Sequence, residues 1–320
     1  GSLQGLGGTR VSGDGIHWGE VEPVRFPRSP DGHQAFDTHN NLVWDPREGR
    51  YLMTTRWDLD DPKTGGSRNV GLFRSQGTGF GAWPEAVDPV LNGSKAHQLY
   101  SQVTFPFYNL YIGLVMVFDT ADPTKVGTVE CRLAWSPSAH GPWSVVGGFA
   151  AGPEAIPRGP PGSFDSHIVF AAAHPVPVPA EGGRVRLYYM GGNGPHNGPR
   201  NSSLGLATLR PDGFIALGGT GTLTASTPVL CTGPRLTVTA DIVAPGGSVR
   251  IGVIAAGGDA PGADAAYSEP LLDNATDAEV VWPGGGDLGH LRGSYVRLRF
   301  ELSGALVYTV GFEQAQQVWI

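Results

Sequence analysis

The chain has 320 residues, including 49 glycines and 27 prolines, and its formal net charge is −7. Because apolar residues still reach 40%, this composition excludes a low-complexity chain and predicts many short strands joined by tight turns. The acidic balance, without a basic cluster, argues against nucleic acid or an anionic membrane surface as partner, and no apolar run is long enough to span a bilayer.

Three turn segments along the chain end on tryptophan at nearly constant intervals. The segments SGDGIHW, SQGTGFGAW and SPSAHGPW end at Trp18, Trp83 and Trp143, which are 65 and 60 residues apart. A fainter copy, LRPDGFIAL, has Phe214 in the place of tryptophan. We expect these tryptophans to pack between strands rather than to bind a ligand.

A second series of segments keeps phase with the first. FDTH, LYSQ and FDSH place Asp37, Ser101 and Asp165 at intervals of 64 residues, and apolar strands follow each of them. Four antiparallel strands per repeat are typical of β-propeller blades. The sequence therefore predicts blades over residues 30–90, 95–150 and 160–217, with residues 8–25 as the outer hairpin of another.

This number of blades is low, since propellers usually have four to eight. We expect the first blade to be incomplete in this chain, with its missing strands supplied by an N-terminal segment or by another chain. The alternative is a first blade built irregularly from residues 1–30.

The strand pattern changes after Gly218. RLTVTAD, SVRIGVIAA, AEVVW, SYVRLRFEL and ALVYTVGF are short alternating segments separated by turn residues, which predicts a β-sandwich. The predicted fold is all-β, with a propeller over residues 1–218 and a sandwich over residues 219–320. Cys131 and Cys231 then fall in different domains, and we expect two buried free thiols, with one interdomain disulfide as the alternative.

Asp37 and Asp165 hold equivalent positions at the first strands of two blades. Because the first strand of a blade lines the central channel, we expect both carboxylates to point into one cavity. Two such acids suit glycoside hydrolysis, in which one acid of raised pKa donates a proton and the other acts as nucleophile or activates water. For either aspartate alone, capping of a turn is the alternative.

Polar and aromatic side chains near these acids are predicted to bind the substrate. Amides and imidazoles can hydrogen-bond sugar hydroxyls, rings can stack on a pyranose, and an arginine can pair with a carboxylate or an anionic substituent. The candidates are His39, Asn40, Asn41, Arg56, Trp57, Tyr100, Gln102, Tyr108, His167, Asn193 and His196. Taken singly, His39 and His167 are better explained as structural hydrogen-bonding residues than as catalysts.

The loop GGNGPHNGPRNSS, residues 191–203, carries Asn193 and His196 and adds Asn197, Arg200 and Asn201 as further candidates for the rim of the site. Turn chemistry alone would also explain its glycines, asparagines and prolines. The sequence has no zinc-ligand spacing, phosphate-binding loop or nucleophile elbow, so no metal and no cofactor is predicted.

The segments SGDGIHW, FDTHNNLVWDPREGRYLMTTR, GSFDSHIVF and YVRLRFELSGALVYTVGF resemble proteins with a domain like the N-terminal domain of glycoside hydrolase family 32. These proteins belong to a wider five-bladed propeller group that includes families 32, 43 and 68. The resemblance covers most of the chain and implies a five-bladed propeller, a C-terminal sandwich and a carbohydrate substrate, with Asp37 and Asp165 as channel acids.

The chain departs from the invertase pattern in several places. The motifs Asn-Asp-Pro-Asn-Gly and Arg-Asp-Pro are absent, and the first blade, which usually supplies one catalytic acid in these enzymes, is incomplete. Glu130 and Cys131 resemble the Glu-Cys pair of invertase-like enzymes, but they fall on a third strand, away from the channel. We therefore interpret that match as chance.

The predicted function is cleavage of a glycan by paired channel carboxylates. The alternatives are a carbohydrate-binding or cell-surface structural propeller without catalysis, and a scaffold whose funnel binds protein. We expect a secreted or cell-surface location. Because Arg56 is the one cation predicted in the site, the expected ligand is a neutral or sparsely charged glycan.

Overall fold

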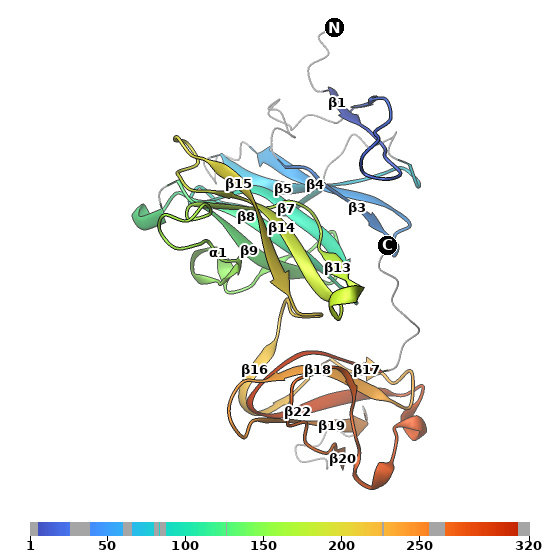
Figure 1. Ribbon diagram of the computed structural model, residues 1–320. Coiled ribbons are helices and arrows are strands. Elements are labelled where there is room, and N and C mark those ends of the chain that lie inside the picture. Colours follow the sequence, from blue (N-terminus) through green and yellow to red (C-terminus); the bar gives the residue numbers. More distant parts are fainter. Residues whose placement is uncertain are drawn as a thin grey trace. The chain divides into compact units, whose positions relative to one another are not determined.

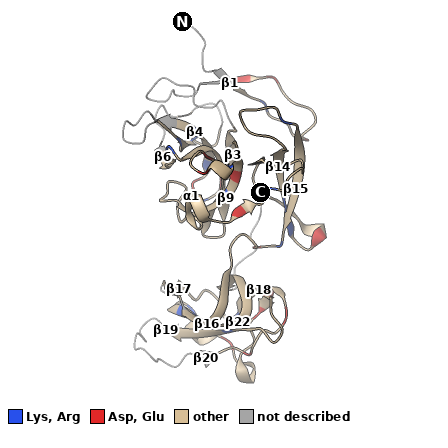
Figure 2. Ribbon diagram, turned by 90° about the vertical axis from the view of Figure 1, so that its left-hand side faces the viewer, with Lys and Arg blue, Asp and Glu red and all other residues tan. Residues whose placement is uncertain are grey.

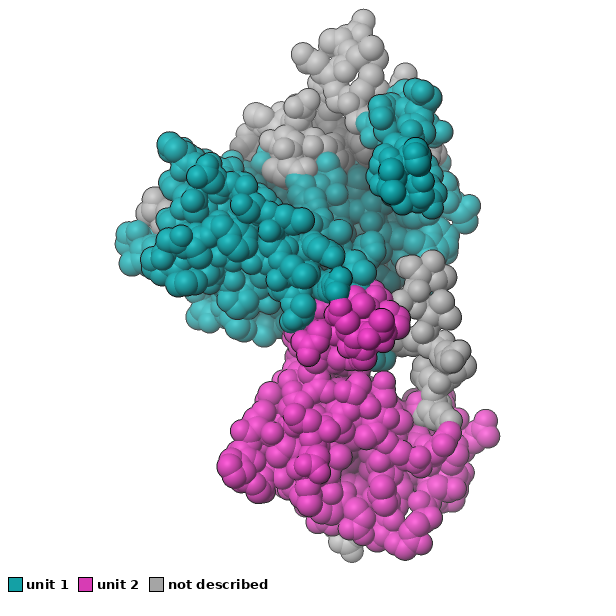
Figure 3. All heavy atoms as spheres, viewed as in Figure 1, with its two compact units in different colours: residues 1–176, 186–208 teal, residues 177–185, 209–320 magenta. Residues whose placement is uncertain are grey.

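The structure is a computed structural model, in which residues 6–25, 39–59, 66–79, 83, 88–125, 127–225, 227–255 and 266–312 are described. This described part is nearly all β: its one α-helix, α1 (Gly148–Ala151), has four residues (Figure 1). The chain divides into two compact units, residues 1–176 with 186–208 and residues 177–185 with 209–320 (Figure 3). None of the described helices is long and apolar enough to cross a membrane.

The strands as far as β15 are short and closely spaced, as the turn-rich sequence predicts. Their bounds are β1 (Leu6–Thr9), β2 (Glu22–Arg25), β3 (Asn41–Asp45), β4 (Arg50–Leu59), β5 (Ser67–Arg74), β6 (Asp88–Leu91), β7 (His97–Phe107), β8 (Leu110–Asp119), β9 (Val129–Ser136), β10 (Ser144–Val145), β11 (Glu154–Ile156), β12 (Ile168–Ala171), β13 (Val176–Val178), β14 (Arg184–Gly192) and β15 (Ser202–Leu209).

Two of the predicted blades contain four antiparallel strands in chain order. Strands β3 to β6 form one four-stranded sheet, and β7, β8, β9 and β10 pair in the same way. In the third repeat β12 pairs with β14, and β14 pairs with β15. A parallel pairing of Ile168 with Val129 joins β12 to β9.

The third repeat differs from the prediction in its last strand. We expected a fourth strand before residue 217, but the next strand, β16 (Leu217–Thr224), pairs with β22 (Tyr295–Phe312) instead. The β1–β2 pair is an antiparallel hairpin, as predicted, and forms a separate two-stranded sheet among the described strands.

Packing between the first two repeats explains why their strands are so apolar. Strands β7, β8 and β9 are buried along almost their whole length, as expected for a sheet covered on both faces. Their core combines residues of both repeats, namely Leu52, Val70, Leu72, Leu91, Leu99, Tyr111, Val115, Val117, Ala134, Ala139 and Trp143. A second cluster, Met53, Trp57 and Phe73, belongs to the first repeat alone.

The tryptophans of the three turn segments have different environments. Trp143 is buried in the shared core and donates a hydrogen bond to the Ala139 carbonyl at 3.1 Å. Trp83 is partly buried against the Met53 cluster, whereas Trp18, between β1 and β2, is 57% exposed. The core-packing interpretation therefore holds for Trp143 and Trp83 and is wrong for Trp18.

The second unit is organised around the 18-residue strand β22. The other strands of its sheet are β16, β17 (Val229–Leu230), β18 (Leu236–Ile242), β19 (Ser248–Ala255), β20 (Ala266–Tyr267) and β21 (Ala275–Glu279). The first half of β22 pairs with β19 and the second half with β18, and Gly304 separates the halves with φ 49°. A side chain there would be strained and would lie 2.5 Å from the Ala244 Cβ, so glycine permits this bend.

Both cysteines are free and buried, which confirms the first of the two alternatives for them. Burial raises the pKa of Cys131 to about 12, so this thiol stays protonated at neutral pH.

Candidate functional site

Asp165 is the one predicted catalytic acid for which contacts can be given, because Asp37 lies outside the described residues. Its carboxylate is buried just before β12, where Oδ1 accepts a hydrogen bond from Ser163 Oγ at 2.8 Å and Oδ2 accepts one from Tyr189 Oη at 2.7 Å. Both carboxylate oxygens therefore have a side-chain donor.

Glycines allow the chain to close tightly around Asp165. A Cβ at Gly159 would lie 2.2 Å from the Asp165 Oδ1 atom, and one at Gly191 would lie 2.7 Å from the Asp165 Cβ. At Gly205 on β15, a Cβ would lie 2.2 Å from Cζ of Tyr189. These glycines are thus required by close approach to the carboxylate or to its donor.

This close approach gives a prediction for Gly205→Ala. The added methyl group must displace the Tyr189 ring, so we expect a loss of about 1–3 kcal/mol in the free energy of unfolding, as for other overpacked sites. Denaturant unfolding measures it. The matched control is Gly79→Ala, because a Cβ at Gly79 meets nothing within 4 Å, and an equal loss in both variants would contradict the packing argument.

The electrostatic setting keeps Asp165 ionised. Burial raises the pKa of Asp165, but hydrogen bonds from Tyr189, Ser163 and the backbone outweigh burial, so this pKa lies below its ordinary value. Burial and the bond to Asp165 together raise the pKa of Tyr189 to about 12, so the phenol remains a donor at neutral pH.

The lowered pKa of Asp165 predicts a pH dependence of stability. A carboxylate whose pKa is lower in the folded state stabilises the fold above its unfolded pKa of about 4, and this stabilisation is lost as pH falls through the folded pKa. The free energy of unfolding of Asp165→Asn should therefore lie below that of the wild type at pH 7. Denaturant unfolding from pH 7 to pH 3 should show this gap narrowing below about pH 4; a constant gap would contradict the prediction.

The predicted residues before and on β3 make contacts within the first unit. Asn41 is buried, and its Oδ1 accepts the Thr104 backbone N–H at 3.1 Å, while Asn40 Oδ1 accepts a hydrogen bond from Thr55 Oγ1 at 2.5 Å. Burial lowers the pKa of His39, and a hydrogen bond with the Ala172 backbone partly opposes this effect. These side chains therefore also have structural roles, and their contact with a sugar stays a prediction.

Three more predicted residues are buried in the sheets. Trp57 is 5% exposed and lies edge-on to Phe73, with ring centroids 6.1 Å apart, so its face is covered by protein. Gln102 is fully buried and donates from Nε2 to Thr104 Oγ1 at 2.9 Å. Arg56 is 8% exposed.

Tyr108 lies in the turn after β7, which is the far end of this strand from Tyr100. Its φ is 48°, its side chain is 39% exposed, and its carbonyl accepts a hydrogen bond from the Arg47 guanidinium. Eight residues of strand separate Tyr108 from Tyr100, or roughly 26 Å at the usual rise. The two tyrosines therefore do not belong to one compact site.

A group of aromatic and basic side chains does come together around Tyr100. The His196 ring lies 4.7 Å from the Tyr100 ring and 5.6 Å from Phe118, and the Arg68 guanidinium carbon lies 5.1 Å from the Tyr100 ring centroid. Phe170 on β12 contacts Tyr100 edge-on at 6.0 Å. Tyr100 itself is only 5% exposed, so it supports its neighbours instead of offering a free face to a sugar.

The loop after β14 carries His196 to this position. Asn193 Oδ1 accepts the Asn201 backbone N–H at 2.8 Å and closes the loop, while the His196 N–H donates to the Gly127 carbonyl at 2.7 Å. Arg200 donates from Nη1 to the His196 carbonyl. Hydrogen bonds within the loop thus fix the backbone that presents His196 and Arg200.

Three arginines act on this histidine. Burial lowers the pKa of His196, and the positive charges of Arg200, Arg68 and Arg56 lower it further. We call these three arginines and His196 the arginine–histidine cluster. The sequence predicted Arg56 and His196 for the substrate site and Arg200 for its rim. Arg68 was missed because it lies at the start of β5, a third strand, and no residue of a third strand was predicted to line the site.

Asp165 and the Arg200 side chain lie on opposite faces of β14. Successive strand residues point to opposite faces. A Cβ at Gly191 would meet Asp165, whereas a Cβ at Gly192 would lie 3.3 Å from the Arg200 Cδ atom. His167 follows Asp165 closely in the chain: its backbone N–H donates to the Gly192 carbonyl, and its Nδ1 lies 2.9 Å from Ser166 Oγ.

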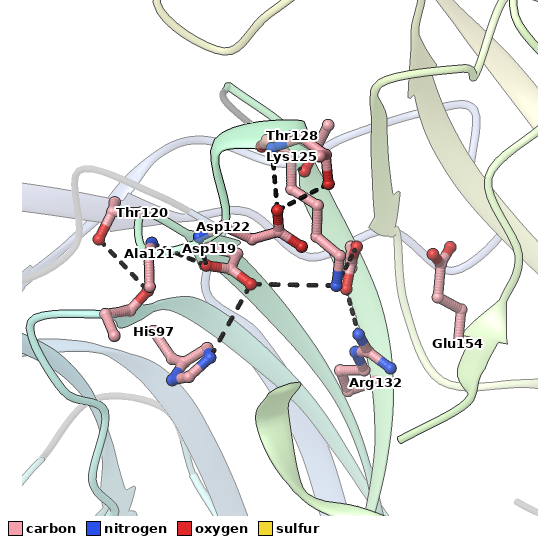
Figure 4. Close-up of polar contacts among 12 residues, drawn as sticks. His97, Asp119, Thr120, Ala121, Asp122, Lys125, Thr128, Arg132 and Glu154 are labelled. Carbon is pink, nitrogen blue, oxygen red and sulfur yellow. Dashed lines mark hydrogen bonds and ion pairs between the residues drawn. The ribbon is translucent and has the colours of Figure 1, made fainter. Parts of the chain in front are cut away.

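A separate network of buried charges surrounds Glu130 on β9. Glu130 Oε1 accepts from Arg158 Nη2 at 2.7 Å and lies 3.3 Å from Lys125 Nζ, and Oε2 pairs with Arg132. Lys125 also approaches Asp119, which His97 reaches from another side, both at 3.9 Å (Figure 4). Both carboxylate oxygens of Glu130 thus take part in ion pairs.

This network explains how charges are tolerated on apolar strands, where few occur (Figure 2). It also agrees with a structural role for Glu130. Within the residues that the structure describes, no group of three or more His, Cys, Asp or Glu side chains has the arrangement to hold a metal ion.

Comparisons with solved structures identify glycoside hydrolases as structural neighbours. One, described as a glycoside hydrolase, is 15% identical with a TM-score of 0.46 over 63% of this chain and 56% of its own. Zg3597, a family 117 glycoside hydrolase of the marine bacterium Zobellia galactanivorans, is 12% identical with a TM-score of 0.38 over 93% and 90%. A mutant of the GH43 protein BlXynB from Bacillus licheniformis is 8% identical with a TM-score of 0.31 over 95% and 92%.

This chain thus spans little more than half of the first of these proteins. No protein-family model matches the chain, and a comparison with curated proteins found no match.

Proposed function

We propose that this protein is a glycoside hydrolase-like, carbohydrate-active protein, built as a five-bladed propeller over residues 1–218 with a C-terminal sandwich over residues 219–320. The observation that carries the proposal is the setting of Asp165, a buried carboxylate kept ionised by Tyr189 and Ser163 immediately before β12. Such a group can stabilise a developing oxocarbenium ion, act as nucleophile or activate water.

The lowered pKa of Asp165 assigns it only one of the two carboxylate roles. A general acid must be protonated when the substrate binds, which an acid of lowered pKa is not at neutral pH. The proton donor has to be another group. Asp37, which the repeat aligns with Asp165, is our candidate for that role.

A second candidate function is carbohydrate binding without catalysis. It is favoured by the hydrogen bonds that occupy both oxygens of Asp165, since a carboxylate that only holds a turn has the same environment. In that case the arginine–histidine cluster would bind a sugar that is not cleaved.

Incubation of the purified protein with a panel of polysaccharides tests both functions. Release of reducing ends supports hydrolysis, and binding on a glycan array without release supports the binding function. A protein that neither binds nor cleaves any glycan of the panel would overturn both.

A further inference from the structure

The arginine–histidine cluster concentrates positive charge at one place in an acidic protein. Arg68 comes from β5, Arg56 from β4, and His196 and Arg200 from the loop after β14, so segments far apart in sequence meet there. The net charge of the chain is −7, so its overall composition does not account for this cluster.

Two of these cations, Arg68 and Arg200, form no ion pair with those acidic side chains that the structure describes. The Arg68 guanidinium stacks on Tyr100, and the backbone N–H of Arg68 donates a hydrogen bond to Gln98 Oε1 at 2.9 Å. Within the described part of the chain, Arg200 donates only to the carbonyls of Pro195 and His196. The network around Glu130 shows the opposite pattern, in which every arginine faces a carboxylate.

His196 adds an independent sign of a missing partner. Its Nδ1 atom is buried and has no hydrogen-bond partner in the described part of the structure. Buried polar atoms usually have one, because an unmade hydrogen bond is unfavourable. An anion between the arginines and the imidazole would satisfy the nitrogen and relieve the repulsion among the cations.

The cluster is also held in place before any ligand arrives. The Tyr100 ring supports Arg68 and His196, and the Gly127 carbonyl fixes the backbone of His196. Burial decreases from Arg56, which is 8% exposed, through the half-buried Arg68 to the exposed Arg200, so the charges reach from the interior to solvent. Preorganised guanidinium groups suit planar, bidentate recognition of an anion.

We propose that the arginine–histidine cluster binds one anionic substituent of a sugar, a carboxylate or a sulfate ester, so that the ligand of this protein is an acidic glycan. This inference rests on the proposed carbohydrate function and names its substrate class. It refines the expectation of a sparsely charged ligand, which assumed a single cation at Arg56.

A glycan array with matched pairs tests the inference. Each uronate is printed beside its methyl ester, and each sulfated sugar beside its desulfated form, so that only charge differs within a pair. We expect the wild type to prefer the acidic member. A preference within the uronate pairs identifies the anionic group as a carboxylate, and a preference within the sulfate pairs identifies it as a sulfate ester.

Variants then locate the binding. Arg68→Gln and Arg200→Gln should each weaken binding of the acidic member by about tenfold or more, as expected for loss of a charged hydrogen bond. Arg184→Gln makes the same charge change at an exposed position of β14 and should bind like the wild type. Because Arg200 is exposed, its replacement leaves folding intact even if Arg68→Gln is less stable.

The possible outcomes separate the inference from the proposed function. Equal binding of both members of a pair, or wild-type affinity in both Arg68→Gln and Arg200→Gln, overturns the inference alone. Cleavage or binding restricted to neutral glycans also overturns the inference, but it supports the proposed function. Binding to no glycan, together with no release of reducing ends, overturns the proposed function and the inference with it.

Discussion

Asp165→Asn should lower the turnover of a cleavable glycan by about a thousandfold or more, while the variant still folds at pH 7. Asparagine has almost the same size and shape and can still accept the hydrogen bond from Tyr189 or Ser163. It lacks the negative charge that a nucleophile, base or oxocarbenium-stabilising group requires. Initial rates at saturating substrate, measured beside thermal unfolding, separate the loss of chemistry from the loss of folded protein.

Two further variants make this experiment specific. Asp122→Asn removes a partly exposed carboxylate from a turn of the same unit and should leave turnover unchanged. Tyr189→Phe removes a donor to Asp165, so the pKa of Asp165 should rise and the acid side of the pH–rate profile should move to higher pH. If Asp165→Asn unfolds early but its folded fraction turns over like the wild type, Asp165 only caps a turn.

Glu130→Gln should cause the largest loss of stability among single replacements of charged residues in the first unit, about 3–5 kcal/mol in the free energy of unfolding. Glu130 is 1% exposed and lies against Lys125, Arg132 and Arg158. The neutral amide would remove the negative charge that balances these cations, so their mutual repulsion would increase. Its NH2 group would also replace one carboxylate oxygen, so a buried N–H group would lose its acceptor. Denaturant unfolding at pH 7 gives the difference.

The control for this prediction is Glu48→Gln in the same unit. Glu48 pairs with Arg50 at 3.8 Å and with His140 at 3.1 Å, but its side chain is 23% exposed, so solvent screens both pairs. We expect a loss of about 1 kcal/mol or less. An equal loss in the free energy of unfolding of the two variants would show that the ion pairs of Glu130 stabilise the fold no more than exposed pairs do, and would contradict the prediction.

The sequence by itself determined the strands, their grouping and most of the turns. Alternation of apolar residues and glycine-rich turns are local properties, and they recur with nearly the same period before β3, β7 and β12. The two in-phase series therefore placed two four-stranded repeats correctly. The same local pattern could not show that β16 pairs with β22, because pairing is a choice between distant strands that look alike in sequence.

The sequence identified only some residues of the candidate site. Asp165 and His196 stand out as polar residues in apolar or glycine-rich surroundings, so both were predicted. Arg68 begins an ordinary strand, and only the packing of that strand beside β7 brings its guanidinium over Tyr100. Sequence gives no sign of this contact.

Tertiary structure alone decided which polar residues act together. The Tyr189 hydroxyl that holds Asp165 lies 24 residues away in sequence, and Gly191 and Gly192 turn neighbouring groups to opposite faces of β14. Burial likewise covered Trp57 and Tyr100, which the sequence offered as sugar-stacking rings. The physical reason is that side-chain type and spacing are local, whereas register, burial and the sum of nearby charges depend on strands brought together from the whole chain.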